Sequence, residues 1–596
     1  MTSSPAFPSG SHRSGVAGVP WAVVRGATSR DEAQEHTPAR TKRLVSSTWL
    51  REPAAVFASS LLLYSWIGWL GAYVIQTYTA DGLARTGQAF AVLFGRDPHL
   101  AAIGFIWGPL TVLTIIPLMA LLAPLGWSLL AGPLASALYG ALALALLTLI
   151  LRDCGLPPAW RITWLALTGA HPLIVQNAVQ GLSEAAFLAC LLLSFYGFVL
   201  WQRHRQLLAL LIAGAGVGIS LWCRYDGLAW LAAGTLVLAG WYVLQRPARW
   251  RSIAEASVLT FIMPAVWALG LWMLVNWQIM GNPIFFLVGP GSTATTPDTA
   301  RYLGAAHPFA AAHGSLAGAL ALLARQIIDV GPLLVPATVL SLIVAAWRRR
   351  GADLVSLILA WSILGFTTFT AFQGLLPPFS RYFFWIVPAG VIAAATLHSA
   401  VPTAWLRHAW AFCVAALLLL GDTRLAVRAW PILPEPPLLR TISVLLHPPE
   451  VTDVRDVRGQ LDEYRTIAAT LDGQPAGTRT LIDAASGGSN LILLVRRPHD
   501  IVTTTDRRFF TILREPAGTV DQILVPRPTI DAMGRSEVLR SYPRLYEDGA
   551  AWATLVQEIP GGRDWRLYAI APPAGAALNA AASGDAARPL SPGSGR

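Results

Sequence analysis

Charged residues are scarce in this chain of 596 residues: Asp, Glu, Lys and Arg make up 13%, against about 25% in a typical soluble domain. Hydrophobic residues make up 54%, and the mean hydropathy is +0.51. This composition excludes an ordinary soluble globular protein and is typical of a chain that crosses a membrane several times. The net charge of +11 does not indicate nucleic acid, because the arginines fall mainly in short clusters between apolar runs, as membrane topology requires. We expect membrane lipids as partners and no nucleic acid.

Cysteine is also scarce, with 4 residues in the whole chain. All of them lie in or beside apolar segments, and no spacing among them is that of metal ligands. We therefore expect neither a disulfide nor structural zinc. We expect no cofactor, although a divalent metal remains an open alternative.

Long apolar runs in the middle of the chain predict the domain boundaries. Residues 1–50 are rich in Ser, Pro, Gly, Ala and charge without apolar periodicity, so we expect a disordered cytoplasmic tail. Residues 51–422 hold the apolar runs, and residues 423–572 are mixed and water-compatible. Residues 573–596 are expected to form a second disordered tail. The first apolar run, Val56 to Ile75, is too long and too late for a signal peptide, so it predicts a permanent span.

The apolar runs predict a polytopic α-helical membrane protein with about eleven transmembrane helices. Residues 110–122 form a short apolar run with prolines at 109, 117 and 124, which predicts a re-entrant or juxtamembrane helix in the first outer loop. A full crossing there would move every later arginine cluster to the outer side, against the positive-inside rule. The expected spans are 56–75, 127–151, 162–179, 183–201, 207–222, 226–244, 254–277, 329–347, 354–372, 384–400 and 408–422.

The region after residue 422 predicts a small α/β domain on the outer, extracytoplasmic side. A helical pattern covers residues 460–471. Strand-like runs occupy residues 480–482, 491–495, 522–525 and 565–570. With the N-terminus in the cytoplasm, the predicted membrane topology places this domain outside.

Polar residues collect at the outer ends of the predicted spans. Asp81 and Arg85 follow the first span four residues apart, so on a helix they share one face. Such groups are costly at a membrane unless they line a wet cavity, which makes them functional candidates; the alternative is a surface ion pair. Three further outward turns carry Ser183 with Glu184, Arg224 with Asp226, and Arg381 with Tyr382.

The order of these segments resembles that of a known superfamily. An outward Asp follows the first span, then come DPHLAAIGFIWGPL, NAVQGLSEAAF at the start of the fourth span, and CRYDGL between the fifth and sixth. This order is similar to that of the GT-C integral-membrane glycosyltransferases, which include the protein mannosyltransferases and aminoarabinose transferases. The resemblance covers residues 56–399 and, more weakly, the outer domain.

The resemblance implies an inverting transfer of a sugar, of hexosyl or mannosyl type, from a polyprenyl-phosphate donor to an acceptor hydroxyl. The reaction would take place at the outer face of a bacterial-type plasma (inner) membrane, as part of cell-envelope synthesis. The acceptor, whether glycan, lipid or protein, and the sugar are not indicated by the sequence.

The resemblance also implies roles for two carboxylates. Asp81 matches the superfamily's first-loop aspartate, the general base, and partial desolvation at the lipid boundary suits that role. Several members follow this acid directly with Glu, whereas this chain has Gly82, which puts a paired-acid mechanism in doubt. Asp97 could supply the second carboxylate or orient the acceptor; the alternative is capping of a helix that starts at Pro98.

The substrate-binding candidates follow from the charge of the donor. A leaving lipid phosphate needs fixed cations, best guanidinium forks. Arg381, in FSRYFFWIVP, resembles the superfamily's Arg-Tyr turn that faces the donor phosphate; its alternative is snorkelling to the headgroups. Arg224 has Asp226 as an alternative local partner. Arg85, Arg301 and Arg325 are further candidates for binding phosphate. Ser183 and Glu184 could bind sugar hydroxyls, the alternative being a plain helix start, and Trp107 could stack on a sugar, the alternative being a place in the interfacial aromatic belt. His99 and Tyr382 are the remaining substrate-binding candidates.

Two functions of other classes remain open at this point. One is a transporter or flippase of lipid-linked saccharides, although transporters tend to have related halves and broken helices at the bilayer midplane. Here the polar residues gather at one face instead. The other is a non-catalytic envelope scaffold, although about eleven spans exceed what an anchor needs.

Overall fold

The computed structural model describes residues 47–289, 292, 307–348, 351–377, 379–427, 455–528, 536–561 and 564–571. The candidate Arg301, most of the expected tail at residues 1–50 and all of the expected tail at residues 573–596 lie outside these residues. The chain divides into two compact units, Met1–Leu50 and Arg51–Arg596. The first is described only where helix α1 begins, so the following account concerns the second.

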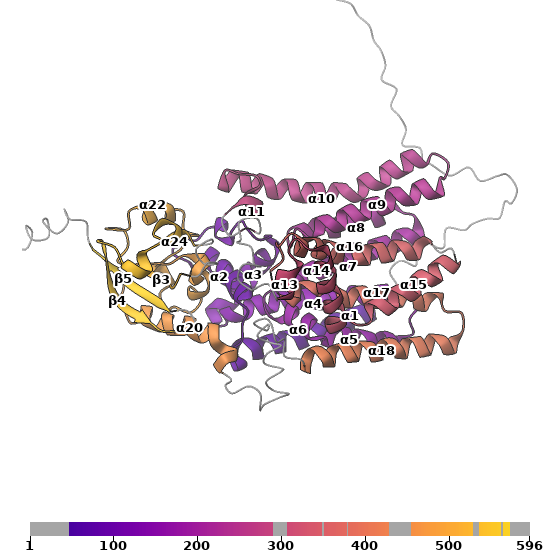
Figure 1. Ribbon diagram of the computed structural model, residues 1–596, viewed down its shortest axis with the longest axis horizontal. Coiled ribbons are helices and arrows are strands. Elements are labelled where there is room, and N and C mark those ends of the chain that lie inside the picture. The colour runs from indigo at the N-terminus through magenta and orange to yellow at the C-terminus, as the bar shows by residue number, and fades with distance from the viewer. Residues whose placement is uncertain are drawn as a thin grey trace, which may run out of the picture. The chain divides into compact units, whose positions relative to one another are not determined.

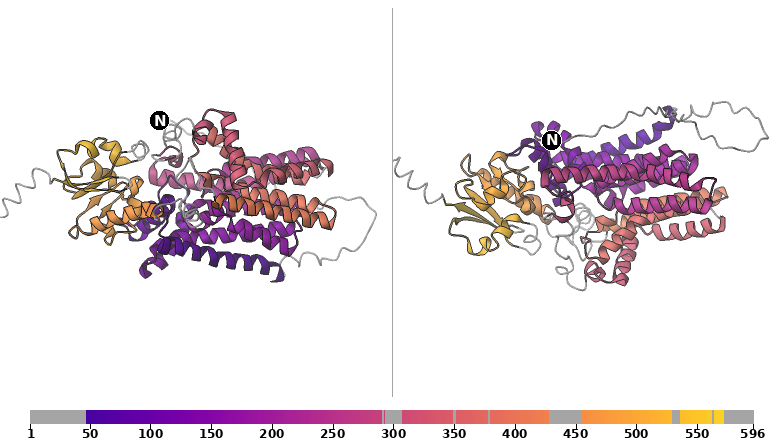
Figure 2. Two further views of the ribbon diagram at one scale, coloured as in Figure 1. Left: turned by 60° about the horizontal axis from the view of Figure 1, so that its bottom comes forward. Right: turned by 90° about the horizontal axis from the view of Figure 1, so that it is seen from above.

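Eight helices of the described chain are long and apolar enough to cross a membrane. This confirms a multi-pass α-helical architecture, and Figure 2 shows these long helices running side by side. The expected count of about eleven is not confirmed, since one bent pair would bring the described number to nine. The eight are α1 (Ser47–Trp69) with η2 (Leu70–Ile75), η5 (Ser128–Leu130) with α4 (Ala131–Asp153), α7 (Ser183–His204), α9 (Gly227–Gln245), α10 (Trp250–Met280), α16 (Gly351–Phe372), η6 (Ser380–Phe383) with α17 (Ile386–Ala400), and α18 (Ala404–Val427).

The span expected at residues 162–179 is two helices, α5 (Pro158–Ala170) and α6 (Pro172–Val179). They meet at His171, whose ψ of 128° lies outside the helical region. The residue before a proline is sterically disfavoured in the α conformation, and Pro172 follows directly. The prediction of one continuous helix was therefore wrong at this point.

Two further expected spans also differ. Residues 329–347 belong to α14 (Leu316–Val330) and α15 (Leu334–Arg348), which are bent by 102° where Gly331 and Pro332 break the helix. Residues 207–222 form α8 (Leu207–Leu221), which has 15 residues. At 1.5 Å per residue that is about 22 Å, shorter than the about 30 Å of hydrocarbon in a bilayer.

Helix α8 packs closely against α7 and α10, and Figure 1 shows α8, α9 and α10 side by side. Glycines permit the approach. A Cβ atom on Gly214 would lie 2.2 Å from the carbonyl oxygen of Phe261, and one on Gly216 would lie 2.7 Å from the amide nitrogen of Ser194. Small residues at such contacts are typical of helix packing in membranes.

The segment between the first two long helices contains α2 (Ala80–Phe94), η3 (Leu100–Ile103) and α3 (Leu110–Leu122). Helix α3 has 13 residues and contains Pro117. Its length of about 20 Å is too short for a full crossing, as expected of a re-entrant or juxtamembrane helix. Its path relative to the membrane stays a prediction.

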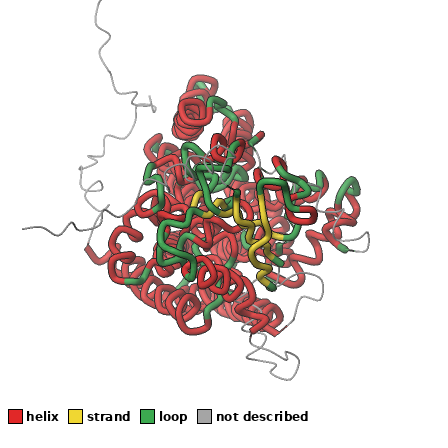
Figure 3. The backbone as a smooth tube through the Cα atoms, turned by 90° about the vertical axis from the view of Figure 1, so that its left-hand side faces the viewer, coloured by secondary structure: helices red, strands yellow, loops and turns green. Residues whose placement is uncertain are grey.

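The C-terminal region contains one five-stranded sheet of order β2-β1-β3-β5-β4, and all named strands of the described chain belong to it (Figure 3). Strand β1 pairs in parallel with β2 and β3, while β5 pairs antiparallel with β3 and β4. The strands are β1 (Thr480–Leu481), β2 (Ile501–Val502), β3 (Gln522–Pro526), β4 (Ala553–Ile559) and β5 (Trp565–Ile570); the helices include α20 (Arg455–Asp472), α21 (Ser489–Leu491), α22 (Phe509–Arg514), α24 (Glu537–Ser541) and α25 (Leu545–Asp548).

The expected helix and three of the expected strands coincide with α20, β1, β3 and β5. The expected strand at residues 491–495 is wrong, because these residues form the end of α21 and a turn. A short buried apolar run does not by itself distinguish a strand from a helical turn. The division at residue 422 stays a prediction, and α18 continues past it to Val427.

Candidate functional site

Four segments that lie far apart in the sequence meet in one group of charged residues. The start of α2 contributes Asp81 and Arg85, and the start of α7 contributes Glu184. The turn before α9 contributes Arg224 and Asp226, and η6 contributes Arg381. We call these six residues the arginine–carboxylate cluster; among them are three arginines and three carboxylates joined by the hydrogen bonds and ion pairs given below.

Asp81 is bound to an arginine 300 residues further along the chain. The Arg381 guanidinium donates a hydrogen bond from Nη2 to Oδ2 of Asp81. The Arg381 side chain is only 8% exposed, whereas that of Asp81 is 34% exposed. Asp81 therefore presents the accessible side of this pair, and Arg381 the buried side.

Glu184 lies at the centre of the cluster and its side chain is 2% exposed. Its Oε1 is 3.1 Å from Nη1 of Arg224 and 3.7 Å from Nε of Arg381. A buried carboxylate is tolerated when it is paired in this way, and loss of a partner is strongly destabilising. Glu184 thus fixes two guanidinium groups relative to each other.

Arg224 is held from two sides, because its Nε also donates to Oδ2 of Asp226 at 2.7 Å. Burial alone would lower the pKa of Arg224, but the charges of Asp226 and Glu184 raise it above its ordinary value. The sequence alternative for Arg224, a local pair with Asp226, is therefore present together with the contact to Glu184.

Arg85 is buried and contacts three different groups. Its Nη1 donates to the backbone carbonyl of Asp81 and its Nη2 to Oγ of Ser183, both at 3.4 Å. Its guanidinium carbon lies 4.4 Å from the centre of the Trp107 ring, a cation–π contact. Burial lowers the pKa of Arg85, and the Asp81 and Glu184 carboxylates oppose that effect.

Aromatic rings cover the other two arginines. The guanidinium carbon of Arg224 is 4.8 Å from the ring centre of Tyr382, and that of Arg381 is 5.4 Å from the same ring. Arg381 also lies 5.0 Å from the ring of Phe379. These contacts restrict the arginine side chains, so the guanidinium groups of the cluster are held in fixed positions.

The start of α2 is positioned by the segment before α7. Thr79 caps α2 by accepting from the Gly82 amide at 3.3 Å, and its own amide donates to the Gln180 side chain at 2.8 Å. A Cβ atom on Gly82 would lie 1.7 Å from the backbone oxygen of Gln180. This close approach leaves no room for a larger residue at position 82.

Ser183 and Glu184 form the first turn of α7, but Ser183 does not cap it, since the N-cap is Leu182 and lacks a side-chain hydrogen bond. The hydroxyl of Ser183 instead lies 3.5 Å from Oε2 of Glu184 and accepts from Arg85. Both residues therefore belong to the charged group rather than to a plain helix start.

Asp97 contacts the C-terminal region, and His99 contacts Asp97. Oδ2 of Asp97 accepts from the Arg507 amide at 3.0 Å, and Nδ1 of His99 lies 2.6 Å from the Asp97 carbonyl oxygen. Capping of a helix at Pro98 is not observed, because η3 begins at Leu100. The described structure thus places these two candidates outside the arginine–carboxylate cluster.

Of the remaining arginine candidates, Arg325 lies 3.8 Å from Asp329, which also pairs with Arg424 at 3.5 Å. Arg301 lies outside the described residues. Sequence reasoning did not identify Thr79 and Gln180 as residues that position α2; the only signal for Gln180 was its place in NAVQGLSE.

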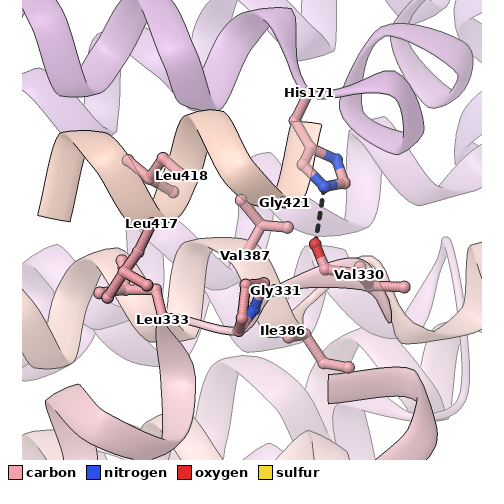
Figure 4. Close-up of a pocket in the computed structure, with 10 residues that line it drawn as sticks. His171, Val330, Gly331, Leu333, Ile386, Val387, Leu417, Leu418 and Gly421 are labelled. Carbon is pink, nitrogen blue, oxygen red and sulfur yellow. Dashed lines mark hydrogen bonds between the residues drawn. The ribbon is translucent and has the colours of Figure 1, made fainter. Parts of the chain in front are cut away.

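A small pocket lies elsewhere, where the bend between α14 and α15 meets α17 and α18 (Figure 4). Figure 4 shows His171 directed at the backbone oxygen of Val330, 2.9 Å away. The other ring nitrogen of His171 accepts from the Leu173 amide at 3.3 Å. This histidine is therefore satisfied within the fold, and the pocket is otherwise lined by apolar residues and glycine.

The chemistry of the cluster is that of fixed cations facing a partly exposed carboxylate. Three guanidiniums can stabilise an anionic group such as phosphate. Asp81 can accept a proton once it is free of Arg381. In the part of the chain that the structure describes, no three His, Cys, Asp or Glu side chains are grouped to hold a metal ion.

The fold and the cluster thus define a multi-pass membrane protein with a compact charged site at the ends of its helices. No protein-family model and no curated protein sequence matches the chain. Among solved structures, it is similar to ArnT from Cupriavidus metallidurans bound to undecaprenyl phosphate, at 16% identity over 89% of this chain and 100% of that one, with a TM-score of 0.48.

A second similar structure is the oligosaccharyltransferase AglB from Archaeoglobus fulgidus in complex with an inhibitory peptide and a dolichol-phosphate. The identity is 12%, the match covers 80% of this chain and 70% of that one, and the TM-score is 0.43. Both are glycosyltransferases of the GT-C superfamily, which the sequence resembles. Because both TM-scores are below 0.5, the functional argument rests on the residues of this chain.

Proposed function

We propose that this protein is a membrane glycosyltransferase that moves a sugar from a polyprenyl-phosphate donor to an acceptor hydroxyl at the outer face of the membrane. The observation that carries the proposal is the ion pair of Asp81 with Arg381 inside a cluster of three buried or half-buried arginines. A general base and a phosphate-binding cation are thereby in direct contact.

In the proposed reaction the acceptor oxygen attacks the anomeric carbon of the donor sugar, and the bond from that carbon to the phosphate oxygen breaks. The acceptor proton passes to the Asp81 carboxylate. The lipid phosphate leaves as an anion that faces the guanidinium groups. Attack from the side opposite the leaving group inverts the anomeric configuration.

The charge balance of the cluster supports this order of events. Its three guanidiniums and three carboxylates balance in charge, so a phosphate that replaces a carboxylate on a guanidinium keeps the cluster close to neutral. Asp81 is the more exposed partner on Arg381, which makes it the carboxylate that a phosphate can replace. Displacement of Asp81 from Arg381 by the donor would remove a cation that opposes protonation of its carboxylate, which couples donor binding to activation of the base.

We also infer that the N-terminus is cytoplasmic and that the C-terminal domain faces the extracytoplasmic side of a plasma membrane. The support is the distribution of arginines between the apolar segments. The sugar and the acceptor are left to experiment.

The decisive test uses the purified, membrane-reconstituted protein with a panel of radiolabelled polyprenyl-phosphate sugars. Asp81→Asn keeps the shape and the hydrogen-bond acceptor but loses the base, so transfer should fall by about 10²- to 10⁴-fold while donor binding is retained. Asp548→Asn is the matched control, because it removes a carboxylate that is 54% exposed and paired with Arg544. A folded Asp81→Asn protein that transfers sugar at the wild-type rate would remove Asp81 from the mechanism.

A further inference from the structure

Helix α2, which carries Asp81 and Arg85, is in backbone contact with the C-terminal domain. A Cβ atom on Gly87 would lie 1.6 Å from the carbonyl oxygen of Ser489 and 2.7 Å from its carbonyl carbon. Both contacting atoms are backbone atoms, so a larger residue at position 87 cannot be accommodated by a side-chain rotation. The glycine therefore permits an approach that no other residue would allow.

A charged contact lies further along the same loop. Asp97 accepts from the backbone amide of Arg507 at 3.0 Å, and its Oδ1 is 3.4 Å from Nη2 of Arg507. This contact joins residues 410 positions apart in the sequence. The amide of Arg507 is a fixed donor, so the contact specifies position as well as charge.

Both contacts involve segments that follow the carboxyl ends of parallel strands of the sheet. Ser489 follows β1 and Arg507 follows β2, and these two strands run in parallel. The carboxyl ends of parallel strands are where α/β domains commonly hold a ligand. In this chain the segments that follow β1 and β2 contact α2 and the loop after it.

Apolar contacts extend the interface toward Asp81. Leu83, two residues from Asp81 and 2% exposed, belongs to the same apolar core cluster as Leu461 and Ile467 of α20. Ile492, also 2% exposed, packs with Ala91 near the other end of α2. The interface therefore follows most of the length of α2.

A polar contact ties the preceding turn to α20. The side chain of Arg465 donates to that of Gln76 at 2.5 Å, and Gln76 has a φ of 63°, in the left-handed region that a non-glycine residue adopts at a free-energy cost. The C-terminal domain thus contacts the chain on both sides of Asp81.

We propose that the C-terminal domain is a positioning element of the proposed site, and that the contacts of Gly87 with Ser489 and of Asp97 with Arg507 set the location of Asp81 relative to Arg381. The inference rests on the proposed transferase function. Gly87 is six residues from Asp81, which is about 9 Å along the helix axis. A shift imposed at Gly87 reaches Asp81 because the segment between them is one uninterrupted helix.

The test compares Gly87→Ala with Gly240→Ala and Gly270→Ala. The control glycines are also helical, but a Cβ atom at either one would meet nothing within 4 Å. Alanine is the better helix former, so a loss in Gly87→Ala does not come from α2 itself. We expect transfer by Gly87→Ala to fall by on the order of 10²-fold at nearly unchanged donor affinity, since a misplacement of about 1 Å can have that effect. Both controls should match the wild type.

Asp97 provides a second pair of variants, which separates positioning from catalysis. Asp97→Asn keeps an oxygen acceptor for the Arg507 amide, whereas Asp97→Ala removes it. Positioning predicts near-normal transfer by Asp97→Asn and impaired transfer by Asp97→Ala. Equal impairment of both variants would show that the charge of Asp97 is required, and would overturn the positioning role of its hydrogen bond with the Arg507 amide.

Hydrogen exchange at the Arg507 amide reports the docking without any activity measurement. We expect faster exchange in Gly87→Ala and in Asp97→Ala than in the wild type. Unchanged exchange in both would contradict the docking contact. Faster exchange with wild-type transfer, in a protein whose Asp81→Asn variant is inactive, would overturn the positioning role and leave the proposed function standing. Absence of transfer by the wild type with every donor would overturn both.

Discussion

Substitution of Arg381 tests whether this residue binds phosphate or only neutralises carboxylates. Its guanidinium contacts Asp81 through Nη2 and Glu184 through Nε. Lysine keeps the charge at one point and loses the planar fork, while alanine loses both. We therefore expect donor affinity to fall in the order wild type, Arg381→Lys, Arg381→Ala.

The size of the effect follows from the contacts that are lost. A hydrogen bond to a charged group contributes about 1.5–3 kcal/mol. With about 1.4 kcal/mol for each factor of ten, removal of one such bond to the donor phosphate weakens binding roughly 10- to 150-fold. Arg381→Ala should reach at least this range, and Arg381→Lys should lie between it and the wild type.

Stability must be separated from binding, because Arg381→Ala also removes one of the two arginine partners of Glu184. Breaking a buried ion pair costs about 3–5 kcal/mol when the other charge stays buried, and less here because Arg224 remains. The matched variant is Arg381→Ala with Glu184→Gln, which removes the residual charge. It should melt at a higher temperature than Arg381→Ala alone without regaining donor affinity.

The assay is titration of the reconstituted protein with a polyprenyl-phosphate sugar in the absence of acceptor, together with a thermal melt of each variant. Equal donor affinities for wild type, Arg381→Lys and Arg381→Ala would refute the phosphate-binding role. Arg381 would then be a counter-ion of Asp81 and Glu184 only.

Three further predictions concern other parts of the chain. Burial, with the charge of Asp97 adding to it, raises the pKa of Asp506 to about 6. The contribution of Asp506 to stability is therefore present below the pKa of the unfolded chain and is lost as pH rises through 6. Asp506→Asn should raise the free energy of unfolding at pH 7.5 by on the order of 1–2 kcal/mol, and thermal melts at pH 4 should show no such gain. Gly82→Ala should destabilise the protein by about 1–3 kcal/mol through overpacking against Gln180 and should slow transfer, whereas an unchanged melt would show that the two backbones can separate freely. Reporter fusions at Ala352 and Gly473 should lie on opposite sides of the membrane. The same side for both would overturn the predicted membrane topology.

The multi-pass helical architecture could be predicted from the sequence, since the length of apolar runs is a local signal. Two of the wrong span predictions fall where a local interruption breaks a helix. Pro172 separates α5 from α6, and Gly331 with Pro332 bends α14 against α15. Hydropathy averages over such breaks, so a sum of apolar residues predicts one span where the backbone makes two helices.

The membership of the cluster could also be anticipated, because charged residues at helix ends are conspicuous in a chain this apolar. Of their pairings, only the local one of Arg224 with Asp226 was anticipated. Asp81 and Arg85 are four residues apart, which left a surface ion pair as the alternative to a functional site, but the Asp81 carboxylate accepts from Arg381 and Arg85 donates to the Asp81 backbone. Sequence spacing predicts which side chains share a helix face and is silent on which distant helix end arrives there.

Asp97 shows the same limit from the other direction. Its sequence context permitted a helix cap, a second carboxylate or an acceptor-orienting group. None of these interpretations predicted the contact with Arg507, 410 residues away. The contact depends on where the ends of β1 and β2 meet α2, which is a property of tertiary packing. If that contact positions α2, Asp97 and Gly87 act on the reaction only through Asp81, so combining Gly87→Ala with Asp81→Asn should slow transfer little beyond Asp81→Asn alone. A multiplicative loss in the double variant would mean that the C-terminal domain contributes to transfer by a route independent of Asp81.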